Sequence, residues 1–362
     1  MKPQVIKQNA GADLSKDDFK VSFHQLFDTQ KTRIKASRKF ANKLSGFKEF
    51  VKWINKHKAP DVQVRVTLEA TGVYYEQLVY FLNEKTDFHI SVMLPNKTNA
   101  YFKSLNIKSK TDEIDAKVLG QMGLERNLKA WQPISKQMRT LRQLTRFKVS
   151  LQETKTMVSN RLHALEHSFD ASKEIIKQLK KQVSLLDKQI EKTEQLIIDL
   201  IEADKVLKER IDNICEARGF RPVTIAGIVA EAGGFVLFTS RGQIISYAGY
   251  DIVQKQSGTS IDGKTKISKK GNRYIRKHLF FPAMALARHE PQFKRLYDRV
   301  YERTKIKMKA QVAVQRKALI LIYTLFKKNE PFIADYENKK AAKDFQTQKE
   351  VCRQDVSPAY SE

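Results

Sequence analysis

Cysteine is almost absent from this chain of 362 residues, which contains only Cys215 and Cys352. The two cysteines are far apart in the sequence, and neither has a companion Cys or His at the spacing of a zinc site. The sequence therefore supports neither a disulfide framework nor a structural zinc centre. We expect both cysteines to be ordinary thiols.

Long hydrophobic runs are also missing. No stretch of about 18 apolar residues is available to span a bilayer, and no lipidation motif is present. The first residues, MKPQVIKQNAGADLSK, lack the apolar segment and the small-residue cleavage site of a secretory signal. These absences predict a cytoplasmic protein with no membrane partner.

Acidic residues are scarce relative to basic ones. The chain has 67 Lys and Arg against 40 Asp and Glu, which gives a net charge of +27. A charge of this size attracts polyanions by counterion release, so nucleic acid is the first partner to expect and a membrane surface is the weaker alternative. A hydrophobic fraction of 41% predicts folded structure, and the length predicts two or three domains.

Residues 1–130 alternate strand-like and helix-like patterns. A strand over 5–14 and two further β-rich runs predict a three-stranded meander, and an amphipathic helix and a strand ending at Glu69 follow. Another helix, a strand stopped by Pro95, and helices on either side of KSKTDEIDAK complete the region. The resulting order, βββαβαβα, is typical of ribonuclease H-like domains, although other α/β domains give similar patterns.

Two long amphipathic helices are predicted next. Apolar residues recur with a 3,4 spacing over 141–169 and again over 176–211, separated by a break at FDASK. This pattern favours an antiparallel helical hairpin over 131–211 that acts as a spacer or dimerisation arm. Lys148 and Lys155 interrupt the apolar pattern, and contact with nucleic acid is the alternative role for them. A glycine-punctuated, mostly helical domain over 212–330 and a polar tail over 331–362 follow.

Four acidic residues are candidate metal ligands. Asp13 lies in the first strand, Glu69 ends a later strand, and Asp112 and Asp115 are spaced so that a helix would place both on one face. Converging carboxylates repel one another unless a multivalent cation offsets the charge, and oxygen ligands suit Mg²⁺ or Mn²⁺. The implied chemistry is two-metal phosphoryl transfer. Taken singly, each residue is equally consistent with a solvated charge or a helix cap.

Other acidic residues are predicted to lie outside this cluster because they occur in turns or directly before strands: Asp17, Asp18, Asp61 and Asp87.

A serine and a basic segment mark the domain over 212–330. Ser257 and Gly258 are expected in a short loop, and seven basic residues without an acid follow between Lys264 and Lys277. This density favours phosphate contact, with a solvated basic face as the alternative. The candidates for phosphate contact are Lys264, Lys266, Lys269, Lys270, Arg273 and Arg276.

Position alone does not identify a catalytic serine. Ser260 and Ser268 are candidates equal to Ser257, because a hydroxyl needs a base, a metal or a cationic surround to become a nucleophile. Trp131 and Tyr247 are available to stack on bases, and burial in a core is the alternative for both.

Five motifs together resemble the insertion-sequence transposases of the IS110 family, which are relatives of the Piv DNA invertase. The resemblance covers residues 9–326 and rests on the order and spacing of GADLSKDD, LEATGVYY, KSKTDEIDAKVLG, YAGYDIVQKQSG and KISKKGNRYIRK. It implies a RuvC-like domain with the ligands Asp13, Glu69, Asp112 and Asp115. It also implies a coiled coil and a carboxy-terminal transposase domain in which Ser257 forms a phosphoserine link with cleaved DNA.

The same resemblance implies several partners. Donor and target DNA are the substrates, and a structured bridge RNA supplies sequence specificity by base pairing, which suits a basic protein without an obvious base-reading helix. A homo-oligomer, from dimer to tetramer, is the expected working state. Ala12 and the segment ARGFRPVTIAG over 217–227 depart from the usual family pattern, so the resemblance does not predict the backbone conformation of residues 217–227.

Two other functions compete with serine-dependent recombination. A RuvC-like junction nuclease would cleave with metal-activated water and would not use Ser257. A non-catalytic architectural protein would only bridge strands through its basic surface. A covalent protein–DNA intermediate distinguishes the first of these from recombination, and four acids near DNA phosphate argue against the second.

Overall fold

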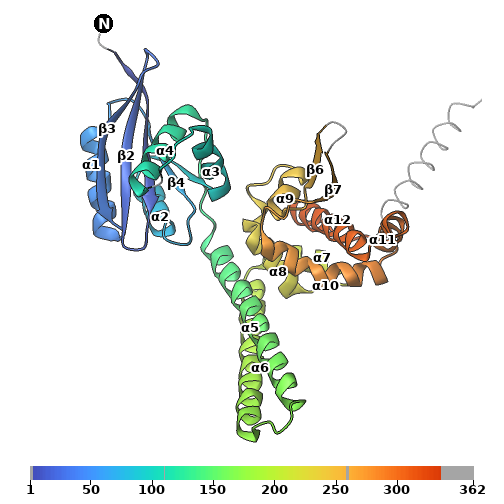
Figure 1. Cartoon of the computed structure of the whole chain (residues 1–362). Helices are drawn as coiled ribbons and strands as arrows, with labels where there is room; N and C mark the ends of the chain where they lie inside the picture. Colours follow the sequence, from blue (N-terminus) through green and yellow to red (C-terminus); the bar gives the residue numbers. More distant parts are fainter. Residues whose placement is uncertain (1–2, 110, 258–260, 336–362) are drawn as a thin grey trace, which may run out of the picture. The chain divides into compact units, whose positions relative to one another are not determined.

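The computed structural model describes residues 3–109, 111–257 and 261–335, and these fall into two compact units, Met1–Pro133 and Ile134–Glu362 (Figure 1). The predicted hairpin region and the predicted domain over 212–330 both belong to the second unit. None of the helices in the described part of the chain is both long and apolar enough to cross a membrane.

The first unit is a mixed α/β domain, as the sequence predicts. In chain order its elements are β1 (Val5–Leu14), β2 (Asp18–Phe27), β3 (Thr32–Ala41), α1 (Leu44–His57), β4 (Val64–Glu69), α2 (Glu76–Lys85), β5 (His89–Met93), α3 (Pro95–Ser104) and α4 (Asp112–Glu125). The sheet order is β3-β2-β1-β4-β5. Strands β1, β2 and β3 form the predicted antiparallel meander, and β4 and β5 extend it in parallel from β1.

The two faces of this sheet differ in chemistry because side chains alternate along each strand. One face is apolar and packs against α1 and α2, with Phe19, Phe40 and Phe50 in mutual ring contact at centroid distances of 5.4 to 5.6 Å. Burial of each such ring contributes about 1.5–3 kcal/mol. The opposite face carries polar residues such as Asn9 and Thr67 and is covered by α4. Figure 1 shows α1 and α4 on opposite sides of the sheet.

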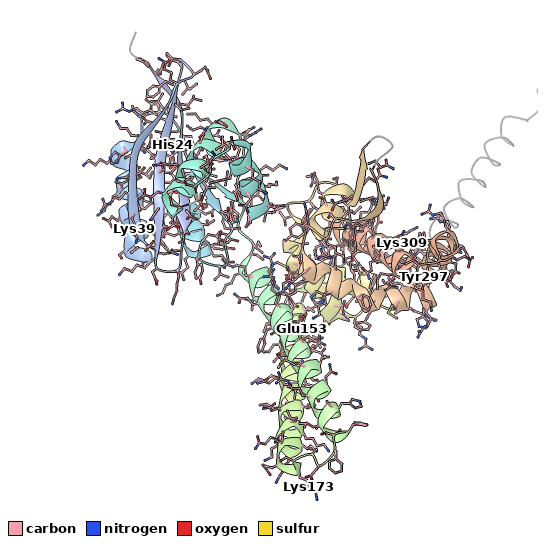
Figure 2. All side chains as sticks on the ribbon, viewed as in Figure 1. His24, Lys39, Glu153, Lys173, Tyr297 and Lys309 are labelled. Atoms are coloured by element: carbon pink, nitrogen blue, oxygen red, sulfur yellow. The ribbon has the colours of Figure 1, made fainter. Side chains whose placement is uncertain are left out.

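Polar side chains on the α4 face are satisfied within the unit. The amide of Asn9 donates to the carbonyl of Gly120 at 2.8 Å and accepts from the Thr67 hydroxyl at 3.0 Å. His24, labelled in Figure 2, hydrogen-bonds the Ser22 hydroxyl at 2.9 Å. Buried polar groups need such partners, so this face fixes α4 in one position.

The second unit begins with two long helices, α5 (Lys136–Glu166) and α6 (Lys173–Glu202), which pack against each other as the predicted hairpin. The two lysines that interrupt the apolar pattern are ion-paired with α6, Lys148 with Glu194 and Lys155 with Asp187. The pairs show why lysine is tolerated at the helix–helix contact.

One predicted boundary is wrong. The apolar spacing over 176–211 suggests one helix, but α6 ends at Glu202 and α7 (Lys205–Cys215) starts after Asp204. The carboxylate of Asp204 caps α7 by accepting from the Leu207 backbone N–H at 3.0 Å. Asp204 breaks the apolar pattern because it ends one helix and begins another.

The rest of the second unit is mostly helical. It contains α8 (Pro222–Glu231), the short helix η1 (Gly233–Phe235), α9 (Arg241–Ala248), β6 (Ile252–Ser257), β7 (Ile261–Ile267), α10 (Arg273–His289), α11 (Pro291–Thr304) and α12 (Lys307–Lys328). Its core includes Ile225, Tyr250, Leu279 and Leu319, all inaccessible to solvent. The two strands pair only with each other in the described structure.

Two aromatic residues considered for base stacking pack within their own units. Trp131 lies edge-on to Tyr80 with ring centroids 4.9 Å apart. Tyr247 lies edge-on to Phe238 at 5.1 Å, and its hydroxyl donates to the backbone carbonyl of Glu231 at 3.1 Å. These contacts favour the packing role for both rings.

Candidate active site and its basic surround

The first unit places its four candidate carboxylates at one edge of the sheet. Strands β1 and β4 are parallel, with Ala12 opposite Leu68, so the next residues, Asp13 and Glu69, lie at the same carboxyl ends. Both side chains are half-buried and belong to the polar face that α4 covers. This arrangement follows directly from the strand register.

Helix α4 brings the other two carboxylates to the same edge. A Cβ added at Gly11 would lie 2.0 Å from the Gly120 nitrogen and 2.2 Å from the Ala116 carbonyl, so β1 and α4 are in backbone contact. A Cβ at Gly123 would meet Asn9, farther back along β1. The amino-terminal turn of α4 therefore points toward the end of β1 that carries Asp13.

The start of α4 is fixed by a cap. Thr111 accepts from the Ile114 backbone N–H at 3.3 Å, so the helix begins at Asp112 and includes Asp115 in its first turn. The sequence predicted helices on either side of KSKTDEIDAK, whereas α4 starts inside that segment because of this cap. Acidic side chains in a first turn also interact favourably with the helix dipole, so their position has a structural benefit of its own.

Neighbouring side chains engage the carboxylates of Asp112 and Glu69. Asp112 forms an ion pair with Lys20 of β2, with 3.3 Å between Nζ and Oδ2. Glu69 accepts from the Thr71 hydroxyl at 2.8 Å through one oxygen and from the Thr98 hydroxyl through the other. Asp112 and Glu69 thus each interact with a side chain that is not one of the other three candidate ligands.

The described residues contain no group of three or more His, Cys, Asp or Glu side chains placed so that it could hold a metal ion. The four predicted ligands therefore share a sheet edge without forming a converged set. Their chemistry suits a hard divalent cation, because all four donors are carboxylate oxygens.

The acids predicted to lie outside the cluster have other surroundings. Asp18 begins β2 and forms an ion pair with Lys39 of β3 at 2.7 Å. Asp61 has a positive φ of 57° in the loop before β4. A left-handed backbone of this kind is typical of Asp and Asn in turns.

Ser257 is the last residue of β6, where its backbone is opposite Ile261 of β7. The prediction that it lies in a loop is wrong, because residues 252–257 continue the antiparallel pairing to that point. Gly258 and Ser260 lie outside the described residues, as do the side chains of Ser257 and Lys264. The Ser268 hydroxyl donates to the Asp251 carboxylate at 2.8 Å and has a structural partner.

The basic segment continues from β7 into the first turns of α10. Lys266, Lys269, Lys270 and Arg273 are exposed, whereas Arg276 is half-buried and donates to the Ala248 carbonyl at 2.7 Å. The exposed members can face a polyanion, although Arg273 also donates to the Tyr274 hydroxyl at 3.2 Å, and Arg276 ties α10 to α9.

Glu231 is a central residue that the sequence analysis did not identify. Its carboxylate is inaccessible to solvent and accepts from Arg146 Nε at 2.6 Å and Nη2 at 2.8 Å, a bidentate ion pair between α8 and α5. It also accepts from the Asn272 side chain at 2.6 Å. Asn272 in turn caps α10 by accepting from the backbone N–H groups of Tyr274 and Ile275.

The network around Glu231 fixes the start of α10, and with it the basic segment, against the hairpin. Arg146 also lies over the Tyr274 ring, with its guanidinium carbon 4.6 Å from the centroid. The only local signal was a single acid in the apolar run PVTIAGIVAE, and that signal does not indicate its partners.

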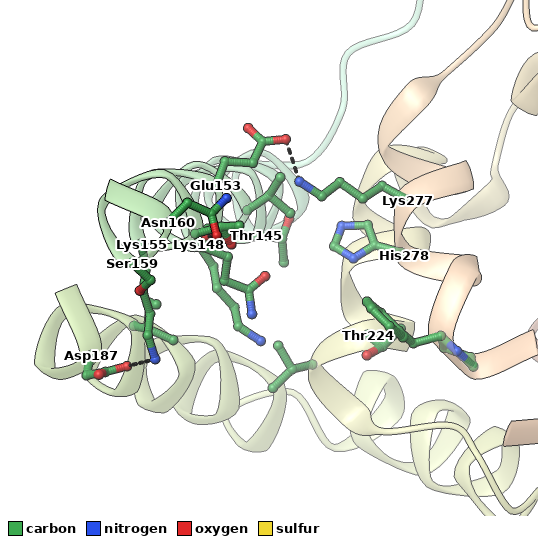
Figure 3. Close-up of a pocket in the computed structure, with 17 residues that line it drawn as sticks. Thr145, Lys148, Glu153, Lys155, Ser159, Asn160, Asp187, Thr224, Lys277 and His278 are labelled. Atoms are coloured by element: carbon green, nitrogen blue, oxygen red, sulfur yellow. Dashed lines mark hydrogen bonds and ion pairs between the residues drawn. The ribbon is translucent and has the colours of Figure 1, made fainter. Parts of the chain in front are cut away.

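A groove of about 680 Å³ lies between the hairpin and helices α8 and α10 (Figure 3). Lys148 and His278 line it, and ion pairs join Lys155 to Asp187 and Lys277 to Glu153 within it. Burial lowers the pKa of His278 to about 4, so its ring is neutral near pH 7. The paired charges leave this groove close to neutral, unlike the segment of exposed lysines.

Comparison with known proteins identifies relatives over most of the chain. Residues 10–168 match the family model described as a transposase of the DEDD IS110 type, and residues 211–298 match the model of the IS116/IS110/IS902 transposase family. Two proteins named pilin gene-inverting protein, from Moraxella bovis and Moraxella lacunata, are 28% and 29% identical over 334 residues, which cover 91% of this chain and 98% of each relative.

A protein of insertion element IS110 from Streptomyces coelicolor is 26% identical over 136 residues, or 35% of this chain and 33% of that protein. Both family models thus agree with the family resemblance found in the sequence motifs, and they match the regions that contain the acidic edge and Ser257. The chain belongs to the IS110 family of transposases.

Proposed function

We propose that this transposase cleaves and rejoins DNA through a phosphoserine intermediate on Ser257, assisted by a divalent cation at the acidic edge of the first unit. The observation that carries the proposal is the placement of Asp13, Glu69, Asp112 and Asp115 at one end of the sheet by strand register and by the glycine contacts of α4. The sheet order β3-β2-β1-β4-β5 supports a ribonuclease H-like, RuvC-like domain.

The chemistry requires stabilisation of charge on a transferring phosphate. In the proposed reaction the Ser257 hydroxyl oxygen bonds to a DNA phosphorus and the broken strand leaves as a hydroxyl end. Attack of a partner strand's hydroxyl on the same phosphorus then releases the serine. Mg²⁺ or Mn²⁺ bound by the four carboxylates would supply positive charge near the phosphate. The exposed lysines and Arg273 would hold the DNA backbone.

Three further parts of the proposal follow from the family. A structured bridge RNA would select donor and target sequences by base pairing, and the net charge of +27 supports binding of a large polyanion. The α5–α6 hairpin would act as a coiled coil that joins subunits into a dimer or tetramer. The acidic edge of one subunit would then act with the serine domain of another.

A cleavage assay tests the central step. Purified protein with its candidate flanking RNA, Mg²⁺ and end-labelled donor and target DNA should form a protease-sensitive DNA adduct. We expect Ser257→Ala to form no adduct, while Ser268→Ala, a matched control with a structural hydroxyl, retains it. Cleavage without an adduct in Ser257→Ala would instead support a metal-dependent junction nuclease that uses activated water.

A further inference from the structure

Lys20 lies at the acidic edge of the first unit. In the antiparallel register of β1 and β2 it is directly opposite Asp13, so the two side chains project from the same face of the sheet. Its ammonium group is also 3.3 Å from the carboxylate of Asp112. Lys20 therefore contacts one proposed metal ligand, Asp112, and shares a register position and sheet face with another, Asp13.

The neighbouring cation on this face has a different partner. Lys39 is opposite Lys20 in the register of β2 and β3, and it forms its ion pair with Asp18 at 2.7 Å. Figure 2 labels Lys39 on this sheet. Asp18 is not one of the proposed ligands. Lys39 also interacts electrostatically with Asp112, but more weakly than with Asp18, so it matches Lys20 in charge and strand position and differs in its main partner.

We propose that Lys20 is an internal counter-cation that occupies part of the divalent-cation position at the acidic edge and must leave Asp112 when the metal enters. The proposal rests on the proposed function, which assigns the metal site. It accounts for the observation that the four carboxylates share an edge without forming a converged set. An ammonium group beside two carboxylates reduces their mutual repulsion in the absence of metal.

Displacement of Lys20 has a functional consequence. A positive charge a few ångströms from a divalent cation weakens its binding, by about tenfold in a site of this exposure. DNA phosphate offers the released ammonium a new partner. DNA and metal should therefore strengthen each other's binding, because each favours the same displaced position of Lys20. The site would fill mainly when substrate is present.

Mn²⁺ affinity of the full-length protein tests this inference without relying on activity. Free Mn²⁺ is measured by electron paramagnetic resonance during titration at constant pH, with circular dichroism to check folding. We expect Lys20→Gln to bind Mn²⁺ about tenfold more tightly than wild type. Lys20→Arg, which keeps the charge, and Lys39→Gln, the matched control, should stay within about twofold of wild type.

The coupling is tested in the same assay. Duplex DNA should increase the Mn²⁺ affinity of wild type and have a smaller effect on Lys20→Gln, which has no ammonium to displace. If folded Lys20→Gln binds Mn²⁺ no more tightly than wild type, the proposed role of Lys20 is wrong. It is also wrong if Lys39→Gln gains as much Mn²⁺ affinity as Lys20→Gln.

A third series separates this inference from the proposed function. One outcome rejects only the role of Lys20: wild type binds Mn²⁺, Glu69→Gln does not bind it, and Lys20→Gln binds it with the same affinity as wild type. If neither wild type nor any variant binds Mn²⁺ beyond the amount that the same DNA binds alone, both the metal site of the proposed function and the role of Lys20 fail.

Discussion

The two units of this transposase use carboxylates in opposite ways. In the first unit Asp112 is 65% exposed and has one ion pair, to Lys20, whereas in the second unit the Glu231 carboxylate is inaccessible and accepts three hydrogen bonds from Arg146 and Asn272. An exposed pair contributes little to stability and exchanges partners readily. A bidentate pair whose carboxylate is fully buried, as in Glu231, is costly to break because that carboxylate would lose its partners. Exposure therefore separates Asp112, which a ligand can reach, from Glu231, which holds helices together.

The largest expected effect tests the first half of this comparison. Glu69→Gln should reduce DNA cleavage by about a thousandfold, because a neutral amide is a poor ligand for a divalent cation and gives little charge stabilisation of the transferring phosphate. Its unfolding midpoint in urea should stay near that of wild type. Asp87→Asn, an acid outside the cluster, should cleave normally, and a large loss of cleavage in that control would contradict the assignment.

The second prediction concerns Glu231. Glu231→Gln replaces the buried carboxylate that accepts from Arg146, whose own side chain is 43% exposed, and should lower the free energy of unfolding of the second unit by about 2–3 kcal/mol. Circular dichroism in urea measures this change. Trp53 and Trp131, which both lie in the first unit, should give an unchanged fluorescence transition.

Glu153→Gln is the matched control for Glu231, because Glu153 pairs with Lys277 at a site where its side chain is 65% exposed. Its effect should be within about 0.5 kcal/mol. Equal effects of the two substitutions would remove the distinction between buried and exposed carboxylates.

The third prediction concerns the backbone contact between β1 and α4. Gly11→Ala adds a methyl group within 2.2 Å of the Ala116 carbonyl and should destabilise the first unit by about 1–3 kcal/mol, measured by tryptophan fluorescence in urea. The displaced helix should also lower Mn²⁺ binding, since it carries Asp112 and Asp115. Gly242→Ala, where the nearest atom is 3.9 Å away, should change neither quantity.

The smallest effect is a pH dependence in the first unit. Burial lowers the pKa of His24 to about 4 from an ordinary value of 6.5. Folded protein therefore holds His24 neutral while unfolded protein takes up a proton below pH 6.5, so stability falls as the pH drops from 6.5 toward 4. Between pH 7 and pH 5 the loss should be about 2 kcal/mol.

Tryptophan fluorescence in urea at several pH values measures this slope. His24→Gln should flatten it even if the variant is less stable overall. The control His167→Gln, at an exposed position, should keep the wild-type slope. An unchanged slope in His24→Gln would show that another group is responsible.

The sequence predicted most of the first unit because its strands have a clear alternation of apolar and polar residues. Asp13 and Glu69 could be assigned to strand ends for the same reason. The position of α4 could not be predicted, since it depends on tertiary contacts of Gly11 and Gly123 that have no local pattern. The boundary at Asp204 was missed because a capping acid interrupts the apolar spacing in the same way as a tolerated polar residue.

The second unit shows a stronger limit of sequence reasoning. Glu231 is one acid in an apolar helix, and its partners Arg146 and Asn272 are 85 and 41 residues away in the chain. No spacing rule connects them. The basic segment was predictable from composition, but the network that holds its helix in place was not.

Mass spectrometry of the covalent protein–DNA adduct tests whether Ser257 is the nucleophile. After nuclease and trypsin digestion, the tryptic peptide over residues 256–264 contains Ser257 and Ser260, and the peptide over 267–269 contains Ser268. We expect a nucleotide phosphate on Ser257, which fragmentation of the first peptide would locate and which would be lost in Ser257→Ala. A phosphate on Ser260 or Ser268, or cleavage of DNA with no modified peptide, would contradict this expectation.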